Sequence, residues 1–155
     1  MVRLEQPVSA AQWSDVRRML GEYAASLNVD LSFQDFDGEL SRLETEYGPP
    51  GGAMLLAVGN GVAVGCIGLR RWSDTTGEVK RLYVVPAARD RGLGRTLAEG
   101  IVALAVSLGY TRLVLDTLPS MTSAQALYLS MGFRIIEAYR FNPVPGTSYM
   151  ALDLE

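Results

Sequence analysis

Two arginines and two glycines share a five-residue stretch, Arg91-Gly92-Leu93-Gly94-Arg95. Glycine lets the backbone approach a ligand closely and turn its N–H groups outward. If the stretch opens a helix, each arginine there is locally unfavourable by roughly 0.3–1 kcal/mol, because the helix dipole is positive at that end. A bound phosphate would reverse that sign. The stretch therefore predicts a phosphate site, whereas the glycines alone would equally fit a solvated basic turn.

The neighbouring residues predict the elements that hold this stretch. Residues 79–85, Val-Lys-Arg-Leu-Tyr-Val-Val, are rich in β-branched and aromatic side chains and predict a strand. Pro86 ends the strand because proline cannot donate to a sheet ladder. Apolar residues then recur at helical spacing from Leu97 to Leu108, and Gly109 suits the C-cap position. The arginine–glycine stretch thus lies between the end of a strand and the start of a helix.

The same segment resembles the coenzyme-binding segment of the GNAT superfamily of acyl-CoA-dependent N-acyltransferases. The signature of that family is Gln/Arg-x-x-Gly-x-Gly/Ala after a strand that ends in Val-x-Pro, and here Leu82-Tyr83-Val84-x-Pro86 precedes Arg89-x-x-Gly92-x-Gly94. The resemblance implies an N-acetyltransferase with acetyl-CoA as co-substrate, and a fold that covers nearly the whole chain. It implies coenzyme contacts from Leu82, Tyr83, Val84, Arg89, Asp90, Arg91, Gly92, Leu93, Gly94 and Arg95.

Acyl transfer from a thioester to an amine requires a stabilised oxyanion, a proton for the departing thiolate and a group that takes the amine proton. By resemblance, a backbone N–H near Leu82 serves the oxyanion. The family often carries a catalytic tyrosine in the pattern Leu-Tyr-x-x-x-Gly-Phe, which reads here from Leu127 to Phe133, so Tyr128 is the candidate acid. The alternative for Tyr128 is an aromatic residue of the core. Glu78 matches the glutamate base of some members, histone acetyltransferases among them, or is a surface carboxylate at a strand end.

Three further residues are candidates for the acceptor side, and one position departs from the family pattern. By resemblance, the segment between the first two helices lines the acceptor, so Phe33, Phe36 and nearby carboxylates would meet an amine; the alternative is a solvated acidic helix face. Asp116, at the end of the next strand, could bind the substrate ammonium or replace Glu78 as the base. Many members carry Asn seven positions before the catalytic tyrosine, where this chain has Met121.

Composition limits the function classes. The chain has 155 residues and a net charge of −3, which fits one domain and argues against a general nucleic-acid binder. Five basic residues gather locally, a pattern that fits one small polyanion: Lys80, Arg81, Arg89, Arg91 and Arg95. Histidine is absent, which excludes Ser-His-Asp, Cys-His and His-ligated metal chemistry, and no metal is expected. The single cysteine, Cys66, lies in an apolar run and predicts a buried thiol.

The expected environment and partners follow from the same sequence. We see no signal peptide and no apolar run long enough to span a membrane, so the default expectation is a cytoplasmic protein without membrane or nucleic-acid partners. Dimers are common in the family that the chain resembles, so a homodimer is compatible with the sequence.

The pattern of elements predicts an α/β fold, or mixed α+β, with a GNAT-like mixed sheet of about seven strands and helices on both faces. The chain order is β-α-α-β-β-β-α-β-α-β-β, and residues 1–155 form a single acetyltransferase domain. The expected strands are residues 1–5, 53–58, 62–69, 78–85, 111–118, 133–139 and 148–154. The expected helices run from Ser9 as N-cap to about Leu27, and over residues 36–47, the stretch ending at 109, and 122–131. Asn60-Gly61 predicts a type I′ hairpin turn.

Two other interpretations remain at this point. Gly92-x-Gly94 between a strand and a helix, with Asp116 ending the next strand, is also found in dinucleotide sites. Leu97 at the third small position, the long connection after Pro86 and the small number of βαβ units oppose that interpretation. A non-catalytic acyl-CoA-binding module of the same fold would share the loop; thioester turnover with amines distinguishes it from an enzyme.

Overall fold

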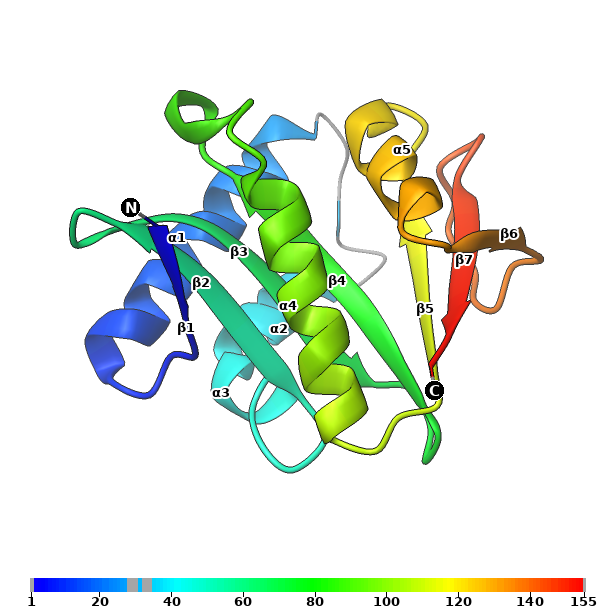
Figure 1. The fold of residues 1–155 in the computed structure, drawn as a ribbon, viewed down its shortest axis with the longest axis horizontal. Coiled ribbons are helices and arrows are strands. Elements are labelled where there is room, and N and C mark those ends of the chain that lie inside the picture. Colours follow the sequence, from blue (N-terminus) through cyan, green and yellow to red (C-terminus); the bar gives the residue numbers. More distant parts are fainter. Residues whose placement is uncertain (1, 28–30, 32–34, 155) are drawn as a thin grey trace.

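The computed structural model describes residues 2–27, 31 and 35–154, and within them seven strands form one sheet flanked by helices (Figure 1). The strands are β1 (Val2–Glu5), β2 (Ala53–Gly59), β3 (Val62–Arg71), β4 (Thr76–Val84), β5 (Arg112–Thr117), β6 (Arg134–Ile136) and β7 (Ser148–Asp153). The helices are α1 (Ala10–Ser26), α2 (Phe36–Ser41), α3 (Leu43–Glu46), α4 (Leu93–Ser107) and α5 (Thr122–Ser130), with a 3-10 turn at Pro86–Ala88.

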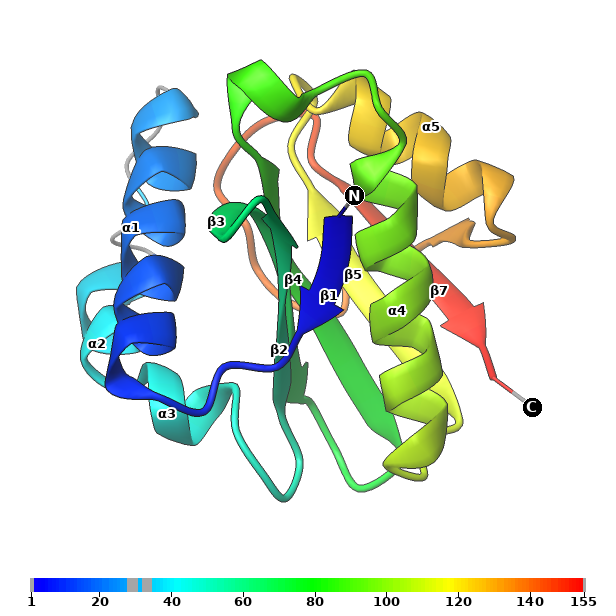
Figure 2. The ribbon, with the colours of Figure 1, turned by 60° about the vertical axis from the view of Figure 1, so that its left-hand side comes forward.

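The sheet has the spatial order β1-β2-β3-β4-β5-β7-β6. Only β4 and β5 pair in parallel; the other neighbours are antiparallel. Helix α4 connects the parallel pair, as a crossover connection requires. Helices α1, α2 and α3 lie on one face of the sheet, and α4 and α5 lie on the other (Figure 2). The predicted mixed sheet with helices on both faces is confirmed.

Local sequence signals explain where the elements begin and turn. Helix α1 starts with a capping box, in which the Ser9 hydroxyl accepts from the Gln12 N–H and the Gln12 side chain accepts from the Ser9 N–H. The β2–β3 hairpin turns at Asn60 and Gly61, whose φ angles of 52° and 78° fit the predicted type I′ turn.

Three predicted elements differ from the structure. The single helix expected over residues 36–47 is two short helices, because the backbone leaves the helical region at Arg42, with φ −122° and ψ 22°. The strand expected over 133–139 spans only Arg134–Ile136. Part of the expected polar connection 70–77 belongs to strands, so that β3 and β4 meet in a tight turn at residues 72–75.

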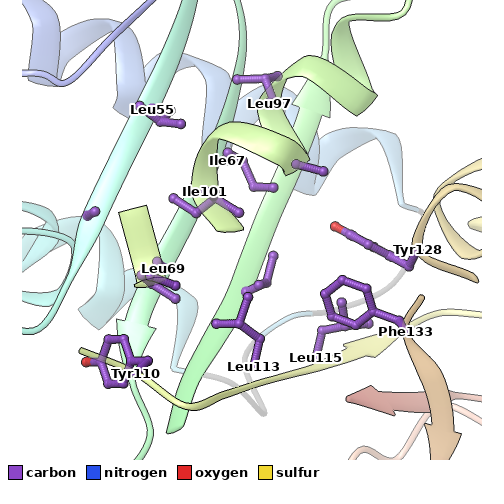
Figure 3. Close-up of a cluster of buried hydrophobic side chains, with 14 of the residues drawn as sticks. Leu55, Ile67, Leu69, Leu97, Ile101, Tyr110, Leu113, Leu115, Tyr128 and Phe133 are labelled. Carbon is purple, nitrogen blue, oxygen red and sulfur yellow. The ribbon is translucent and has the colours of Figure 1, made fainter. Parts of the chain in front are cut away.

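Two hydrophobic cores lie on opposite faces of the sheet. The core under α4 and α5 contains Ile67, Leu97, Ile101 and Leu113 and extends to Tyr128 (Figure 3). The core under α1 to α3 contains another set of buried side chains, including Trp13, Leu20, Leu43, Tyr47, Leu56 and the predicted buried thiol Cys66. Both faces of the central strands are therefore covered, and any charged residue on them must be buried or face a cleft.

The parallel pairing of β4 and β5 is short. It covers Thr76 to Glu78 on β4, opposite Arg112 to Val114 on β5. Both strands continue beyond that point, β4 to Val84 and β5 to Thr117, but they no longer pair with each other. The sheet therefore opens between the two strands at the ends to which the α4 and α5 loops connect.

Candidate active site

A cavity of about 500 Å³ lies beside the opening between β4 and β5. Three groups of residues line it: the end of β4 with Leu82, Tyr83 and Val84; the loop before α4 with Arg89, Asp90, Gly92, Leu93 and Gly94; and residues 120–124 with Leu127. Side chains from the end of α1, Tyr23, Ser26 and Leu27, complete the wall. The predicted coenzyme loop thus faces an open cavity.

The loop before α4 has the backbone geometry of an anion site. Asp90 and Gly92 have φ angles of 65° and 75°, in the left-handed region, and Gly92 is the N-cap of α4. The first N–H groups of any α-helix lack an intrahelical acceptor, and here no side chain caps them either. Consecutive N–H groups around left-handed residues form a concave nest that favours anions, and the helix dipole adds to this preference.

The three arginines of the loop differ in their relation to the cavity. Arg89 lines the cavity, donates through Nε to the Val84 carbonyl at 2.9 Å and lies 5.8 Å above the Tyr83 ring. Arg95 is exposed, hydrogen-bonds the Ser130 hydroxyl and pairs with Glu99 at 3.8 Å. Arg91 is exposed as well. All three loop arginines are therefore exposed at the surface, and of the three only Arg89 lines the cavity.

A bulge in β4 lies at the other side of the cavity. The β3–β4 register shifts between Cys66 and Gly68, so that Arg81 and Leu82 together oppose one residue of β3. Arg81 has a φ of 65°, an unusual value for a residue with a side chain. Such bulges leave backbone groups outside the ladder and re-aim side chains. Leu82, the predicted oxyanion position, therefore lies in a distorted stretch that lines the cavity.

A second, smaller cavity of about 50 Å³ lies between the separated strands. Tyr128 of α5 lines it, and the Tyr128 hydroxyl points toward β4 (Figure 3). The ring contacts Phe133 with 5.2 Å between centroids, and burial raises the pKa of Tyr128 above its ordinary value. The hydroxyl is therefore protonated at neutral pH. Tyr128 belongs to the core and also lines the smaller cavity. Its position is therefore compatible both with a packing role and with the predicted role as an acid.

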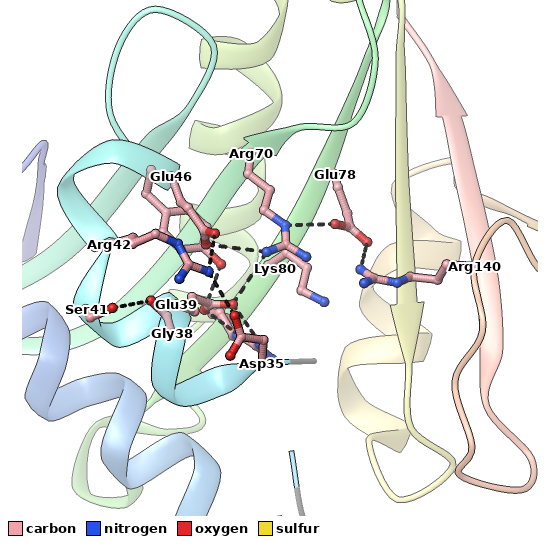
Figure 4. Close-up of polar contacts among 12 residues, drawn as sticks. Asp35, Gly38, Glu39, Ser41, Arg42, Glu46, Arg70, Glu78, Lys80 and Arg140 are labelled. Atoms are coloured by element: carbon pink, nitrogen blue, oxygen red, sulfur yellow. Dashed lines mark hydrogen bonds and ion pairs between the residues drawn. The ribbon is translucent and has the colours of Figure 1, made fainter. Parts of the chain in front are cut away.

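Glu78 is fully buried and lies at the point where the strands separate. Its carboxylate accepts from Arg70 Nε at 3.0 Å and from Arg140 Nη1 at 2.8 Å (Figure 4). The Tyr139 hydroxyl also donates to it, at 2.6 Å. Burial would raise the pKa of Glu78, but the positive charges of Lys80 and Arg70 lower it to about 2. Glu78 is thus charged at neutral pH, and the alternative of a surface strand-end carboxylate is wrong because the residue is fully buried.

Glu39 of α2 and Arg81 form a second buried pair. Arg81 Nε and Nη2 donate to the two Glu39 oxygens, each at 2.9 Å, and the Tyr47 hydroxyl donates to Oε2 at 2.9 Å. Burial raises the pKa of Glu39, but the Arg81 hydrogen bonds and charge bring it below its ordinary value. The expected solvated acidic face of this helix is therefore wrong for Glu39, which is only 1% exposed.

Lys80 and Asp116 join β4 to β5 beyond the last backbone pair. Their charged groups are 3.7 Å apart, and Asn142 Nδ2 donates to the other Asp116 oxygen at 3.0 Å. Burial lowers the pKa of Lys80 to about 8, against the opposing effect of the Glu78 charge. Lys80, Asp116 and Asn142 all line the smaller cavity, where they form its polar wall.

Residues 13–133 match the family described as Acetyltransferase (GNAT) family. The chain belongs to the GNAT acetyltransferase family. An uncharacterised N-acetyltransferase of Schizosaccharomyces pombe is 39% identical over 142 residues, which cover 90% of this chain and 87% of the relative. An N-acetylaspartate synthetase of Danio rerio is 29% identical over 87% of this chain, which spans 49% of that protein.

Solved structures share the GNAT fold. An acetyltransferase of the GNAT family from Staphylococcus aureus aligns over 100% of both chains with a TM-score of 0.83 and 20% identity. A GNAT family acetyltransferase from Elizabethkingia anophelis, solved with acetyl-CoA bound, aligns over 99% of this chain and 98% of its own length, with a TM-score of 0.67 and 19% identity. At these identities the likeness establishes the fold of this GNAT protein.

The structure brings some of the predicted site residues together and separates others. Tyr128, Leu82 and Asp116 line the smaller cavity, and Leu82 also lines the larger one. The other predicted coenzyme residues line the larger cavity, except Arg91 and Arg95, which do not belong to its lining. Phe36 lies in the core under α1 to α3, with the Arg81 guanidinium 5.2 Å above its ring. Phe33 lies outside the described residues. Lys80 and Arg81 do not join the loop arginines, because they pair with Asp116 and Glu39; the predicted five-residue basic cluster is wrong for these two.

Sequence reasoning missed the side chains that pair with the charged groups around this GNAT site: Glu39, Arg70, Arg140, Tyr139 and Asn142. One signal could have found part of this set. Glu78, Lys80 and Arg81 stand in a strand of an otherwise apolar sheet, and charges buried there require partners. The partners themselves come from α2, β3 and the loop before β7, so no local pattern names them.

Among residues 2–27, 31 and 35–154, no three or more acidic or cysteine side chains are arranged so that they could hold a metal ion. The helices of the same residues are too short or too polar to span a bilayer.

Proposed function

We propose that the protein transfers an acetyl group from acetyl-CoA to the primary amine of a small molecule or peptide, directly and in a ternary complex. The observation that carries this proposal is that the two cavities are adjacent and share a wall. Leu82, Met121, Ala124 and Tyr23 line both of them. A thioester whose diphosphate lies at the α4 loop therefore reaches the space between β4 and β5, where Tyr128 and Asp116 lie. The acetyl-CoA bound to the Elizabethkingia protein supports the same ligand here.

Each residue has a role in this proposal. The N–H groups from Gly92 to Arg95 bind the diphosphate at the start of α4. The Leu82 N–H faces the oxyanion that develops during acyl transfer; losing one such donor typically costs about 10²–10³ in rate. The Tyr128 hydroxyl donates a proton to the departing thiolate, because burial keeps that hydroxyl protonated.

The amine side of the proposal uses Asp116 rather than Glu78. Three donors bind the Glu78 carboxylate, and its pKa of about 2 leaves little affinity for an amine proton at neutral pH. Glu78 instead fixes Arg70 and Arg140 beside the cleft. Asp116 lines the smaller cavity and offers its carboxylate to the acceptor ammonium, next to Lys80.

The relatives suggest where to search for the acceptor. N-acetylaspartate synthetases of several vertebrates are 28–33% identical to this chain, the human protein being 33% identical over 99 residues. Their name identifies an amino acid as the acetylated amine. An amino acid with a free carboxylate is therefore the first acceptor class to examine, followed by peptides, polyamines and aminoglycoside-type amines.

The test is release of free thiol from acetyl-CoA across these amine classes, with wild type and Tyr128→Phe. We expect amine-dependent thiol release by the wild type, reduced about 10²–10⁴-fold in Tyr128→Phe, the range that general acid catalysis covers. Acetyl-CoA affinity, measured by calorimetry, should change little. Tyr110→Phe is the matched control, because Tyr110 is also buried but hydrogen-bonds Gly51 away from both cavities. Acetyl-CoA binding without thiol release for any amine would instead identify an acyl-CoA-binding module.

A further inference from the structure

Lys80 is the only lysine in the sequence. Lysine and arginine together account for 14 residues, and all the others are arginine. Arginine keeps its charge at any physiological pH, whereas a buried lysine can lose its proton, which is why lysine can serve as a base. The chain also has no histidine. Lys80, which is 4% exposed, is therefore the one basic side chain suited to exchange a proton near neutral pH.

Lys80 lies in the smaller cavity, beside the residues to which the proposed function assigns the reacting groups. Leu82, Asp116 and Tyr128 belong to the same lining. The Lys80 ammonium group is 3.7 Å from one Asp116 oxygen, and Asn142 Nδ2 donates to the other oxygen at 3.0 Å. An acceptor ammonium that binds the Asp116 carboxylate in this cavity therefore lies next to Lys80 Nζ.

The charges near Lys80 come from several elements. Three strands contribute Glu78 and Arg81 of β4, Asp116 of β5 and Arg70 of β3, of which Figure 4 shows Glu78 and Arg70. The cavity lining and the same ion pairs add further titratable or charged groups: Tyr23 of α1, Glu39 of α2, Tyr128 of α5, and Tyr139 and Arg140 of the loop before β7. Burial lowers the pKa of Lys80 to about 8, although the Glu78 and Asp116 charges oppose this shift.

An ion pair with Asp116 would require only a positive charge at position 80. Arginine supplies that charge to the neighbouring buried carboxylates, Glu39 and Glu78. Lysine differs from arginine at such a position in its ability to give up the charge. A base whose pKa lies close to neutral pH can both take up and release a proton during turnover.

From this arrangement, which rests on the proposed function, we infer that Lys80 is the general base that takes the proton from the acceptor ammonium held at Asp116. The freed nitrogen lone pair forms the bond to the acyl carbon, the carbon–sulfur bond breaks, and the thiolate takes the proton of Tyr128. The second proton then leaves the nitrogen and restores the Tyr128 hydroxyl. Lys80 releases its proton to solvent, so that ammonium and thioester give amide, thiol and one proton.

The first experiment compares wild type with Lys80→Arg in amine-dependent thiol release, using the best amine from the screen above. Arginine keeps the positive charge beside Asp116 but does not release its proton. General base catalysis contributes about 10²–10⁴-fold, so kcat should fall by a factor in this range, and KM for acetyl-CoA should change little. The control is Arg134→Lys, the reverse exchange in an exposed pair with Asp153, which should keep the wild-type rate.

The dependence of kcat on pH distinguishes a base from a structural cation. In the wild type, kcat should rise with pH and level off with a midpoint near 8, as Lys80 loses its proton. The midpoint should be the same for two acceptors that are both more basic than Lys80, because the more acidic group of a coupled pair determines which proton leaves first. In Lys80→Arg the midpoint should move to higher pH and follow the basicity of the acceptor.

A second measurement needs neither a variant nor an acceptor. Because Lys80 is the only lysine, protein labelled with carbon-13 lysine gives a single side-chain NMR signal, whose position reports the charge of the amine. A titration between about pH 6 and 10 should show a midpoint near 8. A signal that stays in the charged form throughout that range would overturn the inference, whether or not Lys80→Arg folds.

The outcomes separate the inference from the proposed function. Thiol release with an unchanged kcat and pH profile in Lys80→Arg would overturn the inference and leave acetyl transfer intact. An acetyl group found on Lys80 by mass spectrometry after turnover would also overturn it, because Lys80 would then be an acceptor and not a base. Acetyl-CoA binding without thiol release for any amine would refute the proposed function itself, and the base role with it.

Discussion

The α4 loop presents backbone to its cavity, whereas the sheet face under α1 to α3 presents buried charged side chains. In the loop, left-handed residues and an uncapped helix start supply N–H donors, and the arginines Arg91 and Arg95 are exposed. On the sheet face, carboxylates and cations pair at 2.8–3.7 Å with little exposure. We call this second set, Glu39, Arg70, Glu78, Lys80, Arg81, Asp116 and Arg140, the buried ion network.

Because of this difference, side-chain replacements should affect the stability of the protein differently in the two regions. Replacing an exposed arginine of the loop leaves the fold intact, because surface pairs contribute about 0–1 kcal/mol. Removing one partner from the buried ion network leaves an uncompensated charge inside the protein. Changes to the loop should therefore affect ligand binding at constant stability, and changes to the network should first affect stability.

The largest effect is expected for Glu39→Gln. Arg81, 4% exposed, would keep its charge and lose its paired carboxylate, so unfolding free energy should fall by about 3–5 kcal/mol. Urea denaturation followed by circular dichroism measures this loss. The matched control is Glu44→Gln, which breaks the exposed Arg17–Glu44 pair and should cost less than about 1 kcal/mol. Similar losses in the two variants would contradict the contrast between network and surface.

The second-largest effect is expected for Gly94→Val, which tests whether the α4 loop binds acetyl-CoA. The position lines the larger cavity, and a Cβ there would lie 3.6 Å from Leu127 Cδ2, an ordinary contact for the protein itself. The added methyl groups therefore crowd the ligand rather than the fold. We expect acetyl-CoA affinity to fall at least about 10²-fold, as displacements of about 1 Å in a positioned site can cost. Calorimetry measures the affinity.

The control for Gly94→Val is Gly21→Val on α1, where a Cβ meets no atom within 4 Å. Both variants should keep melting temperatures close to the wild type, and only Gly94→Val should lose affinity. Normal acetyl-CoA binding by Gly94→Val would refute the assignment of the loop.

The loop could be predicted from the sequence because its determinants are adjacent in the chain. Pro86 ends the strand, and Gly92 and Gly94 shape the turn within eight residues of it. The periodicities of the strands and helices likewise predicted the sheet. The buried ion network depends on pairs that are far apart in the chain: Glu39 and Arg81 are separated by 42 residues, and Glu78 and Arg140 by 62. No spacing rule connects such residues before the fold is known.

The predictions that are wrong, for Lys80, Arg81 and Glu39, concern residues whose partners lie far away in the sequence. Proximity in the sequence predicts that Lys80 and Arg81 join the loop arginines, but the bulge at Arg81 and the alternation of β4 direct both side chains into the network. The many acidic residues of its helix predict a solvated face for Glu39. Its burial depends on Arg81 and Tyr47, which lie far from Glu39 in the chain or in another element and donate hydrogen bonds to it.

Acid unfolding is expected to report on Glu78. Its pKa in the folded protein, about 2, is below the ordinary value of 4.5, so its contribution to stability is present above pH 4.5 and is lost as the pH falls toward 2. In Arg140→Gln the carboxylate loses a donor at 2.8 Å, and its folded pKa should rise. Stability should then begin to fall at a higher pH than in the wild type.

The acid experiment is a series of urea denaturations between pH 2 and 7. Arg134→Gln is the control, because Arg134 pairs with Asp153 and both side chains are more than half exposed. Its stability profile should parallel that of the wild type. If Arg140→Gln also parallels the wild type, Arg140 does not stabilise the charged form of Glu78.

The smallest effect is expected for Arg91→Ala, which tests how much an exposed arginine of the loop contributes to acetyl-CoA affinity. Arg91 is exposed at the loop and near the proposed diphosphate site, and exposed ion pairs contribute about 0.2–1 kcal/mol. Acetyl-CoA affinity should therefore fall only about two- to fivefold, with less difference at 0.5 M than at 0.05 M salt because of screening. Arg18→Ala, on the exposed side of α1, should leave affinity unchanged at both salt concentrations. A loss of affinity as large as that in Gly94→Val would mean that this arginine, and not the backbone of the loop, provides most of the binding.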